Sequence, residues 1–231
     1  MTAQGFRVNH ALLAKSRPVF WEREEICWIV GGAGAGKTTI SKALSTQLNI
    51  PVYDMDAGIY GDYHSRFRQE VHPVNKAWSS AENGLDWLLS MSWEEFDSFN
   101  RAALPEYLDL LAEDIARMPP DAALIIDGGI CNPGLLARVF PARRIVCLER
   151  PGQSSEEIWL ANEERRVMKD FIDPLPEPEA KWRKFLEFDS NITATMMEEC
   201  RENQIRVLSW AEGETVERMA GRTAEALGLK E

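Results

Sequence analysis

One segment of the sequence combines the residue types that a phosphate site needs. Gly31 to Thr38 reads GGAGAGKT and matches the pattern G-x4-G-K-[ST]. Its glycines let successive backbone N–H groups point into one small concavity, which suits phosphate oxygens. Lys37 can reach the β- and γ-phosphates of a nucleotide, and the Thr38 hydroxyl can ligate Mg²⁺. A chance match somewhere in this chain has a probability of roughly 1% or less.

The sequence therefore predicts ATP and Mg²⁺ at this segment, with a nucleotide other than ATP left open. The predicted nucleotide-binding residues are Gly31, Gly32, Ala33, Gly34, Ala35, Gly36, Lys37, Thr38 and Thr39.

Three carboxylates follow apolar runs that are typical of buried strands. Asp54 and Asp56 come after Ile50 to Tyr53, and Asp127 comes directly after a later run. In a doubly wound sheet, ligands bind beyond the carboxyl ends of the strands. We expect Asp127 to hold Mg²⁺ with Thr38 and Asp54, and either Asp54 or Asp56 to accept the proton of an acceptor hydroxyl. Such carboxylates can also simply cap the next helix.

Arginines form the third group of candidate site residues. Arg165 and Arg166 lie in a helical stretch and could stabilise the charge of transferring phosphate, although adjacent arginines also pair with nearby glutamates on a solvated face. Arg66 follows Asp56 closely, and its planar fork suits a carboxylate or phosphate of the acceptor. A surface role for Arg66 is an equal alternative. Gly128 and Gly129 complete the predicted substrate-binding set with Asp56.

Five short apolar runs alternate with helical patterns, which predicts βαβ units and an α/β fold: a three-layer, doubly wound, parallel five-stranded sheet. The expected strands are Ile26–Val30, Ile50–Tyr53, Ala122–Ile126, Arg144–Leu148 and Ile205–Leu208. A long helical excursion, 58–120, follows the second run and is expected to form the acceptor side. Residues 1–23 lack a clear pattern and are interpreted as an N-terminal extension of a domain at 24–231.

These features resemble the nucleoside-monophosphate-kinase-like superfamily of P-loop kinases, and within it small-metabolite kinases such as shikimate kinase. Asp54-Met55-Asp56 stands where the family carries D-x-D, and Asp127-Gly128-Gly129 stands where it carries a glycine-rich substrate loop. The resemblance implies that 152–180, with Arg165 and Arg166, is a lid. The sequence departs from the family at Ile130, where shikimate kinases have a third glycine, and in the greater length of the excursion.

Other P-loop classes fit less well. Asn75-Lys76 is followed by Ala77 and Trp78, so the guanine-specific NKxD motif is missing, and Gly128 stands where many ATPase motors carry a second acidic residue. The net charge of −11 argues against a nucleic-acid partner. No signal segment and no apolar run long enough for a bilayer is visible, which predicts a cytoplasmic location without membrane contact.

The first hypothesis is therefore an ATP- and Mg²⁺-dependent kinase acting on the hydroxyl or phosphate of a small metabolite, with an anionic acceptor or a nucleoside or nucleotide among the options. The second is a nucleotide-dependent regulatory protein whose excursion binds a protein partner. A kinase of polynucleotide ends ranks third, because the acidic balance opposes it. The sequence leaves the acceptor and the oligomeric state open.

Overall fold

A single parallel sheet forms the centre of the computed structural model, which describes residues 5–229. The strand order is β2-β3-β1-β4-β5, so β1, which leads into the glycine-rich segment, is central. The strands are β1 (Ile26–Gly31), β2 (Val52–Asp54), β3 (Leu124–Asp127), β4 (Ile145–Glu149) and β5 (Arg206–Ser209). Each expected apolar run thus contributes a strand, and the predicted three-layer α/β architecture is confirmed.

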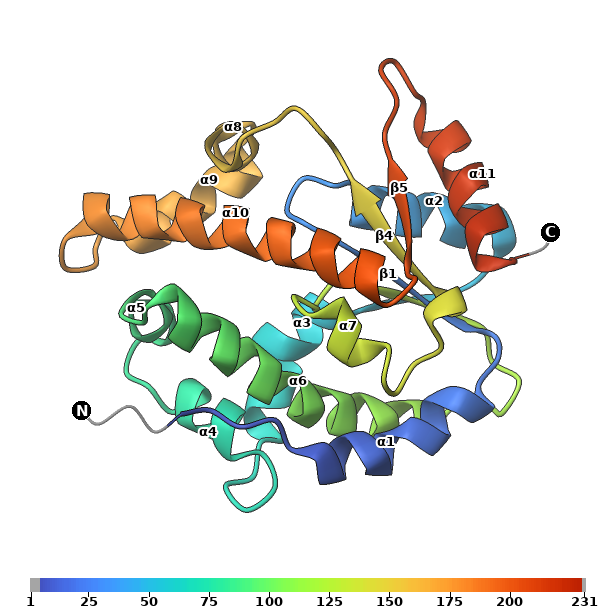
Figure 1. Ribbon diagram of the computed structural model, residues 1–231, viewed down its shortest axis with the longest axis horizontal. Helices are drawn as coiled ribbons and strands as arrows, with labels where there is room; N and C mark the ends of the chain where they lie inside the picture. The colour runs from blue at the N-terminus through green and yellow to red at the C-terminus, as the bar shows by residue number, and fades with distance from the viewer. Residues whose placement is uncertain (1–4, 230–231) are drawn as a thin grey trace.

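The helices and short 3₁₀ turns connect these strands (Figure 1). They are α1 (His10–Glu22), α2 (Lys37–Leu48), α3 (Met55–Tyr60), η1 (Asp62–Ser65), α4 (Pro73–Ser79), α5 (Gly84–Leu89), α6 (Trp93–Ala116), α7 (Pro133–Leu136), η2 (Ala142–Arg144), α8 (Ser155–Leu160), α9 (Glu163–Ile172), α10 (Pro178–Glu202) and α11 (Val216–Leu227).

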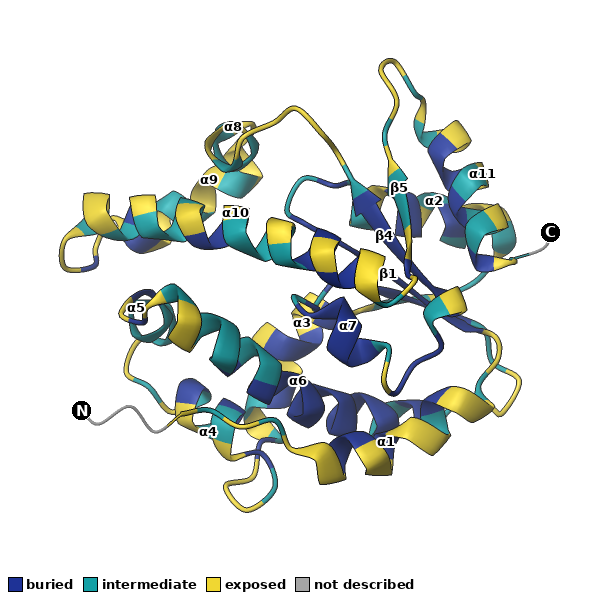
Figure 2. Ribbon diagram, viewed as in Figure 1, coloured by how far each residue is buried: buried dark blue, intermediate teal, exposed yellow. Residues whose placement is uncertain are grey.

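Alternating side chains of the central strands supply two cores, because successive residues of a strand point to opposite faces. Trp28 and Val30 of β1 face a core that also contains residues of α1, α6, α7 and α10. Cys27 and Ile29 face the other core, with α2 and α11. β1 is buried over its whole length, as Figure 2 shows. The rigid centre of the molecule therefore leads directly into the phosphate-binding segment.

The first described residues contain a helix that the weak sequence pattern did not reveal. α1 begins after Asn9, whose side chain accepts hydrogen bonds from the backbone N–H groups of Ala11 and Leu12. It packs along α6, and Phe20 is fully buried. Residues 1–4 and 230–231 lie outside the described residues, so the outer ends of the predicted ranges 1–23 and 24–231 fall there. The division at residue 23 stays an interpretation.

The segment between β2 and β3 is the helical excursion, and most of it is α3 to α6. Its longest helix, α6, begins at Trp93 because Ser92 and Glu95 form a reciprocal capping box, and it continues through Pro105. A separate apolar cluster joins the excursion to α9 and α10; its buried members are Leu89, Ile172, Leu175, Trp182 and Phe188.

Candidate functional site: a phosphate-binding loop with flanking carboxylates

The glycine-rich segment forms a loop between the last residue of β1 and the first residue of α2. The Lys37 ammonium donates to the backbone oxygens of Gly31, at 3.0 Å, and Gly32, at 3.1 Å. The first N–H groups of a helix have no partner within the helix, and they carry the positive end of its dipole. The loop therefore offers backbone donors and an ammonium group to one anion.

Trp210, directly after β5, braces this loop and was missed by the sequence analysis. Its indole Nε1–H donates to the Ala35 carbonyl at 2.8 Å. The Arg150 guanidinium lies 4.6 Å from the centre of the Trp210 ring, in cation–π geometry. A lone tryptophan after the last strand carries no motif, and only the fold places it against the loop. This contact ties the phosphate-binding loop to the segment after β5.

Asp54 and Asp127 are brought together by the register of the sheet, in which they are direct partners on β2 and β3. Asp127 is only 4% exposed, and its Oδ1 has no hydrogen-bond partner. Burial raises its pKa, while the Thr38 hydroxyl and the Lys37 ammonium oppose this shift. An unpartnered carboxylate oxygen beside a threonine hydroxyl is a donor set that fits a hard cation such as Mg²⁺.

Protein side chains alone do not form a metal cage here. Among residues 5–229, no group of three or more His, Cys, Asp and Glu residues could hold a metal ion. A Mg²⁺ ion at Thr38 and Asp127 would therefore take its other ligands from phosphate and water, as this ion commonly does.

Asp54 and Asp56 differ in what they contact. The Asp54 side chain caps α3 by accepting from the Ala57 N–H at 2.9 Å. The Asp56 carboxylate instead lies against the turn after β3, where it accepts a hydrogen bond from the Gly129 N–H. Its pKa is raised, chiefly by loss of solvation, with Lys37 opposing the shift and Asp54 and Asp127 adding to it. Asp56 is therefore the carboxylate placed between the loop lysine and the turn.

The two glycines of this turn are required by the close approach of α3. Gly128 and Gly129 both have positive φ, 74° and 72°. A Cβ atom at Gly128 would lie 2.5 Å from Asp56 Oδ2, and one at Gly129 would lie 2.2 Å from the Met55 Cγ. The indole Nε1–H of Trp28 fixes the turn from below by donating to the Gly128 carbonyl at 3.0 Å. The predicted glycine pair thus leaves room for α3 and the Asp56 carboxylate.

The two lid arginines lie in different environments. Arg165 Nη1 is 3.3 Å from the position that a Cβ atom would take at Gly34, so this guanidinium lies on the phosphate-binding loop. The Arg166 Nε–H donates to the Leu160 carbonyl at 3.1 Å, and the residue is exposed. Ile158 of α8 also contacts Gly34. The structure therefore brings Arg165, and not Arg166, to the loop.

The hydrogen bonds of the Arg66 side chain all run to α6. None of them reaches another predicted site residue. Its Nη1 lies 2.8 Å from Asp114 Oδ2, and its Nη2 lies 3.4 Å from Glu113 Oε2. Both pairs hold the guanidinium against α6, and its ring neighbour is Tyr63 at 5.1 Å. Of the predicted substrate-binding residues, Asp56, Gly128 and Gly129 are brought together, and Arg66 is engaged elsewhere.

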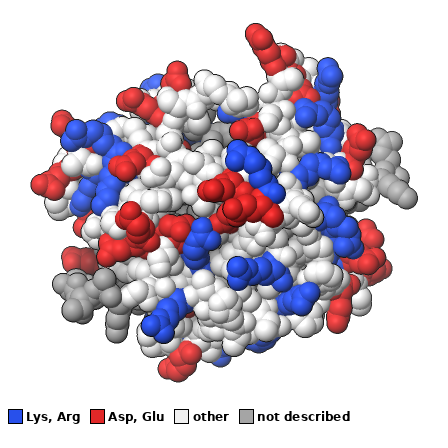
Figure 3. Space-filling model, viewed as in Figure 1, with Lys and Arg blue, Asp and Glu red and all other residues white. Residues whose placement is uncertain are grey.

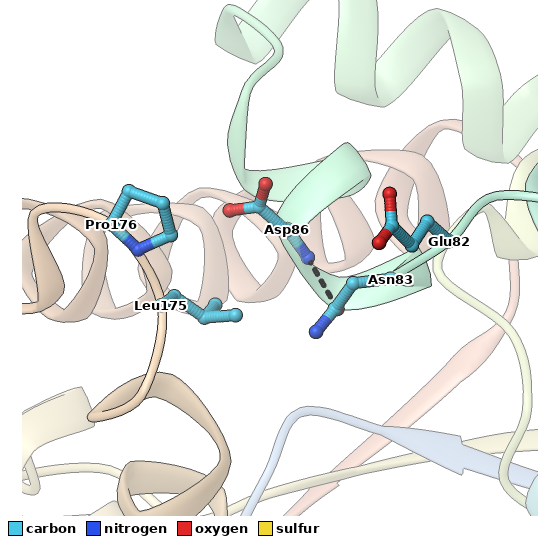
Figure 4. A pocket seen from close by; sticks show the side chains of 5 residues that line it. All are labelled: Glu82, Asn83, Asp86, Leu175 and Pro176. Carbon is cyan, nitrogen blue, oxygen red and sulfur yellow. Dashed lines mark hydrogen bonds between the residues drawn. The ribbon is translucent and has the colours of Figure 1, made fainter.

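Two cavities lie in the described part of the chain, and one of them adjoins the phosphate-binding loop. One of about 820 Å³ lies between the loop, the segment after β4 and α10, and its lining includes Gly32, Ala33, Arg150 and Asp189. A smaller one of about 360 Å³ lies between the start of α5 and the segment before α10, lined by Glu82, Asn83, Asp86, Leu175 and Pro176 (Figure 4). The larger cavity has the size of a small-molecule site and touches the phosphate-binding loop.

The surface carries both signs of charge. On the face shown in Figure 3, Lys and Arg side chains are interspersed with Asp and Glu. Within residues 5–229, no helix combines the length and the apolar character that a bilayer span needs.

One family model matches a segment of this chain. The model of the shikimate kinase family matches residues 33–72, from the phosphate-binding loop through β2 into the excursion. The structure of TT1252 from Thermus thermophilus is similar, with 20% identity, a TM-score of 0.48, and 89% of this chain and 98% of that chain covered. Shikimate kinase from Bacteroides thetaiotaomicron has 18% identity and a TM-score of 0.44, with 88% and 98% covered. No curated protein matches.

The family match supports, at a coarse level, a P-loop kinase that transfers a phosphoryl group from ATP to a small metabolite. In its parallel sheet, its phosphate-binding loop and the matched segment, this chain resembles the shikimate-kinase-like P-loop kinases.

Proposed function

We propose that this protein catalyses transfer of the γ-phosphoryl group of ATP to a hydroxyl group of a small metabolite. The observation that carries the proposal is the place of Asp56, whose carboxylate lies against Gly128 and Gly129 and within the electrostatic reach of Lys37. A general base must lie beside both the donor phosphate and the acceptor hydroxyl. Asp56 is the carboxylate with that position.

The donor side consists of the loop from Gly31 to Thr39. Its backbone N–H groups and Lys37 would bind the phosphates, and Thr38 with Asp127 would hold Mg²⁺. When bound, this ion neutralises charge that develops on the phosphate oxygens. Asp54 caps α3 with one oxygen and lies beside Asp127, so its part is to add negative charge near the metal position.

The transfer step follows from these positions. The acceptor oxygen attacks the γ-phosphorus in line with the bond to the β-phosphate oxygen, a new P–O bond forms, and the old one breaks to release ADP. The hydroxyl proton passes to Asp56. Lys37 and the loop N–H groups stabilise the charge on the departing phosphate. The raised pKa of Asp56 makes its carboxylate a better proton acceptor than an ordinary aspartate.

Residues 152–180 would act as the lid of this site, with Arg165 as the phosphate-contacting residue. α8 and α9 lie in this segment, and both Ile158 and Arg165 reach Gly34. A lid excludes water, which would otherwise compete with the acceptor for the phosphoryl group. The excursion at 58–120 would form the acceptor side.

Acceptor-dependent ADP release from ATP and Mg²⁺ tests the proposal. A panel of hydroxylated metabolites should include members that stimulate release in the natural protein. Lys37→Ala should abolish the stimulation while circular dichroism and the melting curve stay unchanged. Lys42→Ala, an exposed lysine on the same helix, is the matched control and should behave as the natural protein. Tight ATP binding without stimulation by any member of the panel would contradict the proposal.

A further inference from the structure

The cavity of about 820 Å³ beside the phosphate-binding loop has three walls. The first is the loop at Gly32 and Ala33, the second is the segment 148–156 after β4, and the third is one side of α10. Cavities of this size commonly hold small molecules. A polar side chain that faces such a cavity without a partner in the protein therefore indicates what the ligand must offer.

Asp189 of α10 is such a side chain. It lines the cavity and is only 8% exposed. Within residues 5–229, its carboxylate has neither a hydrogen bond nor an ion pair, and only its backbone oxygen is engaged, by the Thr193 hydroxyl at 3.1 Å. A carboxylate that loses water without gaining a donor destabilises the folded protein. A ligand that donates a hydrogen bond to Asp189 would remove this cost.

The other charged residues of the lining differ from Asp189. Glu149 Oε2 accepts from the Ser209 hydroxyl at 2.5 Å, and the Arg150 guanidinium lies over the Trp210 ring. The remaining ones are exposed, namely Glu156, Glu187, Glu198 and Arg201. Among the described residues of this lining, Asp189 is therefore the one charged side chain that is buried and has no polar partner.

Short contacts connect this cavity with Asp56, which does not line it. A Cβ atom at Gly32 would lie 2.5 Å from Oγ1 of Thr193 on α10. The Gly32 carbonyl accepts from the Lys37 ammonium at 3.1 Å. Lys37 Cε and Asp56 Oδ2 lie 3.5 and 2.5 Å from the position that a Cβ atom would take at Gly128. Lys37 thus links the wall of the cavity to Asp56.

We propose that the acceptor extends from Asp56 into this cavity and that Asp189 binds it by accepting a hydrogen bond from a second donor group, a hydroxyl or an amine. The acceptor is then a compound with at least two such groups, such as a polyol or an amino alcohol, and Asp189 determines specificity. This inference rests on the proposed kinase function. It adds a binding residue on α10, which was not among the candidates from the sequence.

Steady-state kinetics test the role of Asp189. The acceptors are glycerol, ribose, glucose, inositol, glucosamine and shikimate, each with saturating ATP and Mg²⁺ and with ADP release as the readout. Asp189→Ala should raise the KM for a stimulating acceptor about 10-fold or more and leave the KM for ATP unchanged. Asp189→Asn keeps the size of the side chain and one acceptor oxygen, so its effect should be smaller.

A matched control and melting curves accompany these variants. Glu202→Gln changes an exposed carboxylate on the same helix that does not line the cavity, and it should change neither KM. The melting curves should show a folded protein for all three variants. A change in acceptor KM that is confined to the Asp189 variants then reports the local contact.

Acceptor analogues that lack one donor test the contact itself. In the derivatives of a stimulating acceptor, each non-reacting hydroxyl or amine in turn is replaced by hydrogen. For the natural protein, at least one derivative should have a kcat/KM about 10-fold or more below that of the parent compound. For Asp189→Ala, the same derivative and its parent should differ less than about 2-fold, because the deleted group no longer has a partner.

The outcomes separate the two claims. An unchanged acceptor KM in Asp189→Ala, or equal losses for every derivative in the natural protein and the variant, would overturn the inference and leave the kinase proposal intact. A raised KM for ATP alone would also overturn it, since Asp189 would then belong to the nucleotide side. No stimulation by any of the compounds, while ATP still binds, would overturn both.

Discussion

The carboxylate of Asp56 lies on the backbone of Gly128: a Cβ atom at Gly128 would come within 2.5 Å of Asp56 Oδ2 and 3.5 Å of the Lys37 Cε. α3, the turn after β3 and the phosphate-binding loop therefore meet at one point, although they are far apart in the sequence. Any side chain at position 128 would push Asp56 away from the lysine. The relationship makes Asp56, the turn and Lys37 one unit.

Asp56 and Asp54 are expected to differ in their effect on catalysis. Asp56→Asn should lower kcat by about 10²–10⁴-fold with little change in ATP affinity, because it removes the proton acceptor. Asp54→Asn should keep most of the activity, since asparagine caps a helix as well as aspartate. Steady-state kinetics of both variants decide the matter. A greater loss of kcat in Asp54→Asn than in Asp56→Asn would contradict the assignment of Asp56 as the base.

The pH dependence of catalysis should report the raised pKa of Asp56. Its carboxylate must be ionised to accept a proton, so kcat/KM should fall as the pH is lowered through this raised pKa, which lies above the ordinary value of 3.8. Asp54 contributes to the upward shift through its negative charge. Asp54→Asn should therefore move the acidic limb of the profile to lower pH. A limb that stays in place in this variant would contradict the electrostatic coupling.

Arg165 and Arg166 provide a matched pair on one helix. Arg165→Ala should lower kcat about 100-fold or more, because this guanidinium lies at Gly34 and would stabilise phosphate charge. Arg166→Ala should lower it less than about 3-fold, since its Nε–H donates to the Leu160 carbonyl and the side chain is exposed. Single-turnover phosphoryl transfer measures both. Equal losses would mean that the lid rearranges and brings both arginines to the phosphate.

Asp127 should cost the protein stability in the absence of nucleotide. Burial raises its pKa, so the folded state favours the neutral form and ionisation above that pKa destabilises it. Asp127→Asn should raise the melting temperature of the nucleotide-free protein at pH 7 by about 2–4 °C, equivalent to about 1 kcal/mol. The gain should shrink as the pH falls from the raised pKa through the ordinary value of 3.8, where the natural carboxyl also becomes neutral.

Calorimetry over a pH series checks this expectation, with the Mg²⁺ dependence of ATP binding measured alongside. The same variant should lose most of that Mg²⁺ dependence. A lower melting temperature at pH 7, together with unchanged Mg²⁺ dependence, would contradict the role given to Asp127.

The donor side of the site could be predicted from sequence because local chemistry determines it. The pattern from Gly31 to Thr38 needs only a preceding strand and a following helix, and both are present. Asp54 and Asp127 followed apolar runs, and the parallel register then placed them side by side. In these cases a short motif, or the rule that ligands bind at the carboxyl ends of parallel strands, is enough to predict the geometry.

The acceptor side depends on contacts between distant segments, which a single sequence does not encode in a readable pattern. Arg66 has the residue type and the spacing of an anion-binding residue, but its partner Asp114 lies 48 residues later on α6. Trp210 carries no motif and gains its position only when the end of β5 packs against the phosphate-binding loop. α1 was missed because its apolar residues follow no regular amphipathic period, although the helix packs along α6.

The most direct test is the fate of the γ-phosphoryl group. With γ-labelled ATP and an acceptor that stimulates ADP release, the account predicts that label appears in the acceptor in a 1:1 ratio to ADP, and that both products vanish in Lys37→Ala and fall strongly in Asp56→Asn. Label recovered as inorganic phosphate at an unchanged rate, with no labelled acceptor and no effect of Asp56→Asn, would contradict the account.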